Sequence, residues 1–228
     1  MPARKSELFL HFQKDQLAVL SRLDSPKKIQ DFLDYEIAYN NEISGDTCLS
    51  PLSVLAQKRA HCIEGAMLAA AAFMFHNKPG LLLDLRANNR DDDHVIAPFV
   101  ENGRWGAVAQ SHFCGLRYRE PIYSSFAELA KSYFEFYYND RAEKTLREYS
   151  VPLDAATLQK DWVDSKGDVF FVSERLDEIR HYNILPQKCK ALRKADSRLF
   201  LSEIFGSGSI PLTKQHSSLD VYKKIRKK

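Results

Sequence analysis

The sequence predicts an α+β fold in which one apolar helix packs on an antiparallel β-sheet. The helix is indicated by the run from Cys62 to Phe75, which is rich in alanine and unbranched side chains and apolar on almost every face. The sheet is indicated by two extended runs on either side of Asn102-Gly103, a strong hairpin signal. A helix without a polar face is buried on most sides, so this helix is expected to form the centre of the core.

Two shorter helices are expected before the central one. Ser25-Pro26 opens the first, since serine caps a helix and proline suits its first turn, and apolar residues at helical spacing continue toward Asn40. Ser50-Pro51 repeats this signal for a short helix that reaches about Gln57. A polar loop, residues 42–47, is expected between the two helices.

Three strands are expected after the central helix. Residues 81–85 are a short apolar run that is typical of a buried strand. The runs 94–100 and 104–111 are expected to pair as antiparallel neighbours across the Asn-Gly turn.

The second half of the chain changes character at about residue 150. Before it, an aromatic stripe from Phe126 to Tyr137 predicts a helix that packs against the core. After it, residues 169–184 have a mixed helical pattern, 206–209 (GSGS) are typical of a flexible linker, and 223–228 form a basic tail. We therefore expect a main domain over residues 1–150, including the N-terminal helices, and a C-terminal helical appendage with a basic tail over 151–228.

Composition excludes several classes of protein. The 33 Lys and Arg against 30 Asp and Glu leave a formal charge of +3, which does not direct the 228-residue chain toward nucleic acid or membrane. Neither a signal peptide nor a stretch of about 18 uncharged apolar residues is evident, so a cytoplasmic location is expected. The sequence gives no oligomeric state.

The cysteines do not indicate a metal centre or a disulfide framework. They are scattered without CxxC spacing at Cys48, Cys62, Cys114 and Cys189. Zinc ligation by His61, Cys62, His112 and Cys114 is the one alternative, but these residues lack paired ligand spacing. We expect no metal and no organic cofactor.

Cys62 is the candidate nucleophile. It falls at the start of the central helix, where amide groups stabilise a thiolate, and it follows Lys58, Arg59 and His61, although Glu64 opposes them. The alternative is a small hydrophobe at the top of a core helix, which is a common use of free cysteine.

His94 is the candidate base, and hairpin counting predicts its partner. A two-residue turn places His94 opposite Ser111, whose hydroxyl can fix the imidazole tautomer. One bulge would substitute Gln110, and His112 is a third candidate just beyond the strand. The alternative for His94 is a surface histidine after the acidic run Asp91–Asp93.

Three segments resemble the transglutaminase-like superfamily of the papain-like thiol fold. They are residues 58–66 (KRAHCIEGA), 93–95 (DHV) and 102–106 (NGRWG); HCIEGA with LRYREP at 116–121 is further similar to uncharacterised bacterial members. In that superfamily a cysteine opens a helix, a histidine lies on the following sheet, and an acidic or amide residue on the next strand orients it. Cys62 and His94 match the first two roles, whereas the third position offers Gln110 and Ser111 without an aspartate.

The resemblance implies a thiol-dependent hydrolase or acyltransferase that acts on an amide or ester bond of a peptide or small molecule. Gln57 would then be the side-chain donor to the oxyanion, and His112 would line the cleft. Trp105 would either line the cleft or fill one face of the hairpin. The rival hypothesis is a non-catalytic member of the fold that binds a peptide or protein partner, which the missing acidic residue favours.

Overall fold

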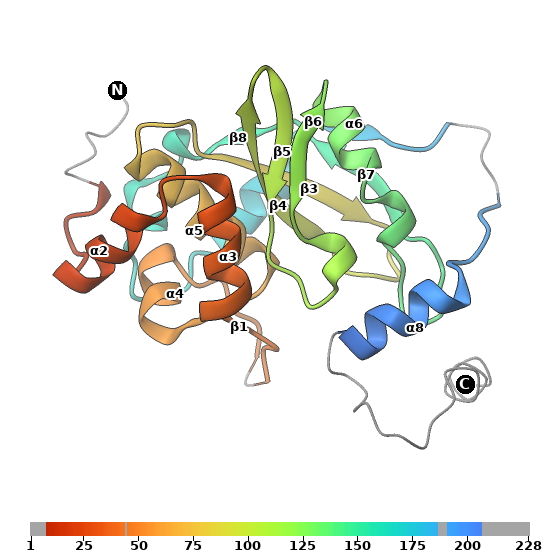
Figure 1. Cartoon of the computed structure of the whole chain (residues 1–228), viewed down its shortest axis with the longest axis horizontal. Coiled ribbons are helices and arrows are strands. Elements are labelled where there is room, and N and C mark those ends of the chain that lie inside the picture. The colour runs from red at the N-terminus through yellow and green to blue at the C-terminus, as the bar shows by residue number, and fades with distance from the viewer. Residues whose placement is uncertain (1–7, 44, 187–190, 207–228) are drawn as a thin grey trace.

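The computed structural model describes residues 8–43, 45–186 and 191–206. It is an α+β structure: helices α2 to α5 gather at one end, the sheet crosses the middle, and α8 lies at the other end (Figure 1). The central helix α5 (Cys62–Phe75) begins and ends at the predicted residues. No helix among the described residues is long and apolar enough to cross a membrane.

The N-terminal helices follow their capping signals. They are α2 (Lys14–Arg22), α3 (Pro26–Glu36) and α4 (Pro51–Gln57). The Ser25 hydroxyl accepts from the Lys28 amide at 3.4 Å, and the Ser50 hydroxyl accepts from the Ser53 amide at 3.2 Å, so both predicted caps are confirmed. The first helix ends earlier than expected because β1 (Ala38–Tyr39) pairs in parallel with β2 (Arg59–Ala60).

The later helices are shorter than the sequence pattern predicted. The aromatic stripe forms α6 (Phe126–Lys131) and then a separate 3₁₀ turn, η2 (Phe134–Phe136), and not one helix to Tyr137. The remaining elements are α7 (Phe171–Glu178), α8 (Ser197–Gly206), η1 (Cys114–Leu116), η3 (Ala155–Thr157) and η4 (Lys160–Trp162).

The sheet has seven strands in the order β6-β5-β4-β3-β7-β9, with β8 pairing β3, and every neighbouring pair is antiparallel. Its strands are β3 (Leu81–Ala87), β4 (His94–Glu101), β5 (Arg104–Val108), β6 (Arg119–Tyr123), β7 (Leu146–Ser150), β8 (Leu153–Asp154) and β9 (His181–Asn183). Glu101 lies opposite Arg104 as predicted, across a turn in which Asn102 and Gly103 have φ of 49° and 72°. Strand β5 ends at Val108 and not at residue 111.

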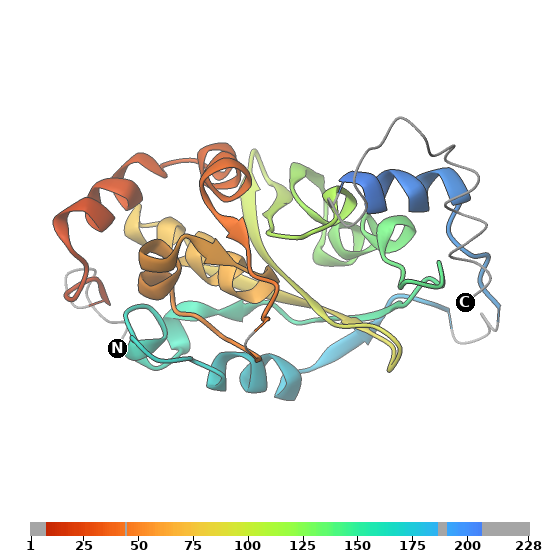
Figure 2. The same cartoon turned by 90° about the horizontal axis from the view of Figure 1, so that it is seen from below.

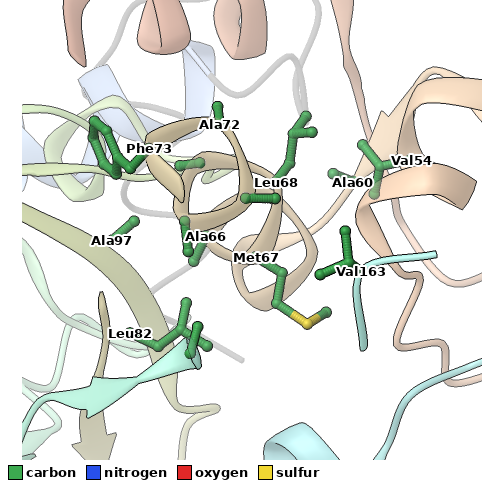
Figure 3. Close-up of a cluster of buried hydrophobic side chains, with 14 of the residues drawn as sticks. Val54, Ala60, Ala66, Met67, Leu68, Ala72, Phe73, Leu82, Ala97 and Val163 are labelled. Atoms are coloured by element: carbon green, nitrogen blue, oxygen red, sulfur yellow. The ribbon is translucent and has the colours of Figure 1, made fainter. Parts of the chain in front are cut away.

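Both faces of the sheet are covered, which explains why its strands read as continuous apolar runs. Leu82 and Ala97 face α5, whereas Leu83 and Ile96 belong to a second cluster beneath α6 and η2. Figure 3 shows the side chains of α5 reaching in two directions, Phe73 and Ala66 toward Ala97 and Leu82, and Leu68 toward Val54 and Ala60. Helix α5 is therefore packed on all sides by the core.

The segment after residue 150 is part of this core and not an appendage. Strand β9 extends the sheet beside β7, and Trp162, Val172 and Leu176 lie in the same cluster as α5. Helix α8 lies beside the helical segments of residues 114–136, far from the N-terminal helices (Figure 2). Gly206 ends α8, while the rest of the predicted linker and the basic tail lie outside the described residues.

Candidate active site

Cys62 opens onto a pocket of about 570 Å³. It is the first residue of α5, half-buried, and its Sγ lies 3.9 Å from the Asp93 backbone oxygen. The pocket is bounded by the end of β1 at Tyr39, by β4 at His94 and by η1 at Leu116. The thiol thus lies both in the pocket wall and at the N-terminus of α5, where the amide dipoles favour negative charge.

His94, the first residue of β4, lies in the same pocket wall and is buried, with 4% of its surface exposed. Its Nε2 is 2.9 Å from the Leu116 carbonyl oxygen. A carbonyl can only accept, so Nε2 carries the proton and Nδ1 is left as the basic nitrogen. The rings of Tyr133 and Tyr137 flank the imidazole at centroid distances of 6.1 and 6.4 Å.

The residues predicted to orient His94 make hydrogen bonds to other groups. Ser111 lines the pocket, but its hydroxyl accepts from the Phe113 amide at 3.1 Å. The Gln110 amide group donates to the Leu33 carbonyl at 3.1 Å, and a Cβ added to Gly65 would meet Gln110 Cβ at 2.5 Å. Gln110 therefore packs beneath the first turn of α5, and a backbone carbonyl replaces the predicted side chain beside His94.

A second imidazole also lies beside the thiol. His61 Nδ1 is 3.9 Å from Cys62 Sγ, while its Nε2 is 3.0 Å from the Thr47 carbonyl and 3.4 Å from Glu64 Oε1. Glu64 follows His61 by three residues, so both stand on the same side of the first helical turn. The acidic residue that the sequence seemed to lack therefore occurs, but beside His61.

Glu64 is completely buried and accepts hydrogen bonds from four donor groups, besides its ion pair with the His61 ring. Its donors are Thr47 Oγ1 at 2.7 Å, the Leu49 amide at 2.8 Å, the His61 amide at 2.8 Å and Asn40 Nδ2 at 3.0 Å. Burial raises the pKa of this carboxyl, but the His61 bonds and charge and the amide donors outweigh it and hold the pKa at about 2. Glu64 is thus a fixed negative charge at neutral pH.

The three cysteines in the described part of the chain have different acidities. Burial raises the pKa of Cys62, but the hydrogen bonds and charges of His61 and His94 outweigh it and lower that pKa to about 6. Burial raises the pKa of Cys48 to about 12, and burial and Glu203 raise that of Cys114. Burial lowers the pKa of His61, but its hydrogen bonds to Cys62 and Glu64 and their negative charges outweigh it and hold that pKa well above its usual value.

Three predicted site residues lie elsewhere. Gln57 is exposed at the end of α4, where its Oε1 accepts from Arg59 Nε at 3.0 Å, so its position does not suit an oxyanion donor. The Trp105 ring lies tilted against the Phe126 ring at a centroid distance of 4.2 Å and lines a separate apolar hollow. His112 does not belong to the pocket lining, but its ring contacts two residues that do, Tyr39 at 4.9 Å and Phe113 at 5.9 Å.

One wall of the pocket is acidic. Carboxylate oxygens of Asp84, Asp93 and Asp177 lie within 4.8 Å of one another. Arg86 contacts Asp93 at 3.9 Å and Asp177 at 3.7 Å, and His181 Nε2 is 2.9 Å from Asp84. Arg86 and His181 therefore already balance the charge of these carboxylates. The four candidate zinc ligands do not all come together, because the Cys114 thiol donates to Glu203 instead.

Two groups at this site were missed by sequence reasoning, for different reasons. The Leu116 carbonyl has no sequence signal, because every residue carries one. Glu64 does have a signal, since its spacing from His61 is that of a capping pair at a helix start; it was interpreted only as an unfavourable charge beside the thiol.

No family model matches the chain, and no curated protein matches it at a significant level. The functional argument therefore depends on the residues themselves. A thiol of lowered pKa beside an oriented imidazole is the pair of groups that nucleophilic attack on a carbonyl carbon requires.

Proposed function

We propose that the protein is a thiol enzyme of transglutaminase-like arrangement that breaks an amide or ester bond through an acyl-thioester on Cys62. The observation that carries the proposal is the setting of this thiol: the N-terminus of a buried helix, between two imidazoles, at the mouth of a pocket. Among the cysteines whose surroundings are described, Cys48 and Cys114 have raised pKa values and Cys62 alone has a lowered one.

In the proposed mechanism His94 is the proton carrier. The Leu116 carbonyl holds the Nε2 proton, so Nδ1 can take the thiol proton. The thiolate attacks the carbonyl carbon, the protonated imidazole gives its proton to the leaving amine or alcohol, and the acyl group remains on sulfur. Water or an amine then attacks the thioester, and His94 returns the proton to Cys62.

The oxyanion formed in each step needs donors near Cys62. One is the Cys62 backbone N–H, because the first amides of a helix have no intrahelical acceptor. The second, in place of Gln57, would come from Tyr39, a residue of the pocket lining, through its hydroxyl. Burial, and then the charge of Cys62, raise the pKa of Tyr39, so its hydroxyl remains a donor at neutral pH.

The proposal is tested by the pH dependence of iodoacetamide alkylation, with mass spectrometry to resolve each cysteine. Cys62 should react half-maximally near pH 6, well before Cys48 and Cys114, because the thiolate is the reacting form. His94→Ala should move that midpoint upward. His112→Ala is the matched control, since this histidine adjoins the pocket through Tyr39 and should leave the midpoint unchanged.

An inert Cys62, or one indifferent to His94→Ala, would leave the rival hypothesis of a peptide- or protein-binding module. If Cys62 is reactive, incubation with activated esters and acyl-peptides should give a Cys62 thioester visible as a mass increase that Cys62→Ala abolishes. Adding a primary amine then separates the two outcomes that share this intermediate, because a transferase gives the amide product and a hydrolase gives the acid.

A further inference from the structure

Helix α8 contacts the loop that orients the candidate base. We propose that α8 belongs to the catalytic assembly and that Glu203 is a positioning residue. Glu203 fixes η1, so that the Leu116 carbonyl keeps the His94 proton on Nε2 and leaves Nδ1 as the base. This inference rests on the proposed function, because it assigns α8 a role in that reaction.

The connection from Glu203 to His94 consists of two hydrogen bonds one residue apart. Glu203 Oε1 accepts from the Gly115 amide at 2.9 Å and from Cys114 Sγ at 3.4 Å. The next residue, Leu116, accepts from His94 Nε2 at 2.9 Å. A shift of η1 therefore moves the carbonyl that sets the direction of the imidazole.

Gly115 is adapted to this contact. A Cβ at this position would lie 2.6 Å from the Phe136 ring and 2.7 Å from Glu203 Oε1, so the packing of Phe136 requires glycine, and a side chain here would also displace the Glu203 carboxylate. The Gly115 carbonyl accepts from Arg119 Nη2 at 2.6 Å. The peptide groups on both sides of Gly115 are thus held, one by α8 and the other by β6.

The burial of Glu203 is costly for a residue that only packs. Its side chain is 2% exposed, and its Oε2 has no hydrogen-bond partner among the described residues. An apolar residue would dock α8 without that cost, as Phe200 does against the Tyr138 ring at 5.9 Å. A specific acceptor for the Gly115 amide is a reason to keep a carboxylate here.

Helix α8 also contacts a residue of the pocket wall. Tyr138, which Phe200 contacts, is part of the pocket lining. Its buried hydroxyl has no partner among the described groups, and burial and then the Glu203 charge raise the pKa of that hydroxyl. The helix therefore contacts both the turn that holds the base and a residue that lines the space in which a substrate would lie.

The experiment compares Glu203→Asp, which keeps the charge but shortens the side chain, with Glu203→Gln, which keeps the length and an acceptor oxygen. Ser202→Ala is the control, because among the described residues the Ser202 hydroxyl bonds within its own helix, to the Leu199 carbonyl. In the full-length protein, Gly115 amide exchange and the ¹⁵N shifts of the His94 ring report the linkage without using Cys62 reactivity. Cys62 alkylation at pH 7 reports its consequence.

Glu203→Asp should speed Gly115 exchange, mix the His94 tautomers and slow Cys62 alkylation about tenfold, since small displacements of a catalytic group are costly. Glu203→Gln should leave Gly115 exchange, the His94 ¹⁵N shifts and the rate of Cys62 alkylation as they are in the wild type. Unchanged exchange and ¹⁵N shifts in Glu203→Asp would overturn the inference even if wild-type Cys62 is reactive. Altered shifts with an unreactive wild-type Cys62 would instead overturn the proposed function, and with it the catalytic role of α8. Should Glu203→Asp not fold, a Glu203→Gln variant that folds but loses Gly115 protection also contradicts the inference.

Discussion

The two sides of Cys62 are built in different ways. On one side, His61 and Glu64 belong to a single helical turn, and the carboxylate is completely buried among fixed donors. On the other side, His94 begins a strand and takes its orientation from a loop carbonyl 22 residues away in sequence. The first side is local and rigid, whereas the second is assembled from distant segments.

This difference suggests that the two imidazoles have different roles. A histidine held near a buried carboxylate stays charged, because the protonated ring gains from that neighbour. It can stabilise a thiolate, but it is poorly placed to give up a proton. His94 has a carbonyl partner that fixes its tautomer without fixing its charge, which suits a group that must gain and lose a proton.

The largest effect is expected when the local side is broken. Glu64→Ala should lower the free energy of unfolding by about 3 to 5 kcal/mol, since it leaves buried donors and an imidazolium without their acceptor. Urea unfolding followed by circular dichroism measures this loss. Glu148→Ala, which removes a half-buried carboxylate that contacts Arg86, is the control and should cost far less. Equal losses in the two variants would mean that the Glu64 cluster contributes no more than a surface pair.

The stability that Glu64 provides should disappear in acid. Its pKa is about 2 in the folded protein against an ordinary 4.5, so its contribution is complete above pH 4.5 and is lost as pH falls through 2. That difference corresponds to about 3 kcal/mol. The gap in unfolding free energy between wild type and Glu64→Gln should therefore narrow as pH falls from 5 to 3. A gap that is constant with pH would contradict a charged Glu64.

Replacing His61 and replacing His94 should have different effects on Cys62 reactivity and turnover. His61→Asn should raise the midpoint of Cys62 alkylation by about one pH unit, which is a loss of about tenfold in rate below pH 6. The variant should still form and release a Cys62 thioester, because His94 remains to carry the proton. His94→Ala should block release as well. If His61→Asn blocks turnover and His94→Ala only shifts the alkylation midpoint, the assigned roles are reversed.

Sequence reasoning predicted the parts of the fold that local chemistry determines. The caps at Ser25 and Ser50 and the limits of the central helix follow from short-range bonds and patterning, and the Asn102-Gly103 turn follows from backbone conformations that these residues adopt readily. The end of β5 and the position of α8 depend on long-range packing, for which the chain gives no local signal.

The candidate site likewise combines residues that the sequence predicted with a contact that it did not. Cys62 and His94 were found because their residue types and positions suggest chemistry, and both line one pocket. The orienting group was mistaken because hairpin counting extended β5 to Ser111, whereas the strand ends at Val108 and the chain turns so that Leu116 reaches the imidazole. A contact made by a loop backbone cannot be obtained from strand register.

The smallest effect is expected at the far end of the hairpin that carries His94. Gly103 has φ of 72°, so Gly103→Ala should destabilise the protein by about 1 kcal/mol. Cys62 alkylation should be unchanged, because the position of His94 depends on Leu116 at the other end of β4 and not on the turn. Gly45→Ala, at another positive φ of 114° outside the sheet, controls for the general cost of such a change. If Gly103→Ala slows Cys62 alkylation while Gly45→Ala does not, strand register and not the loop holds the base.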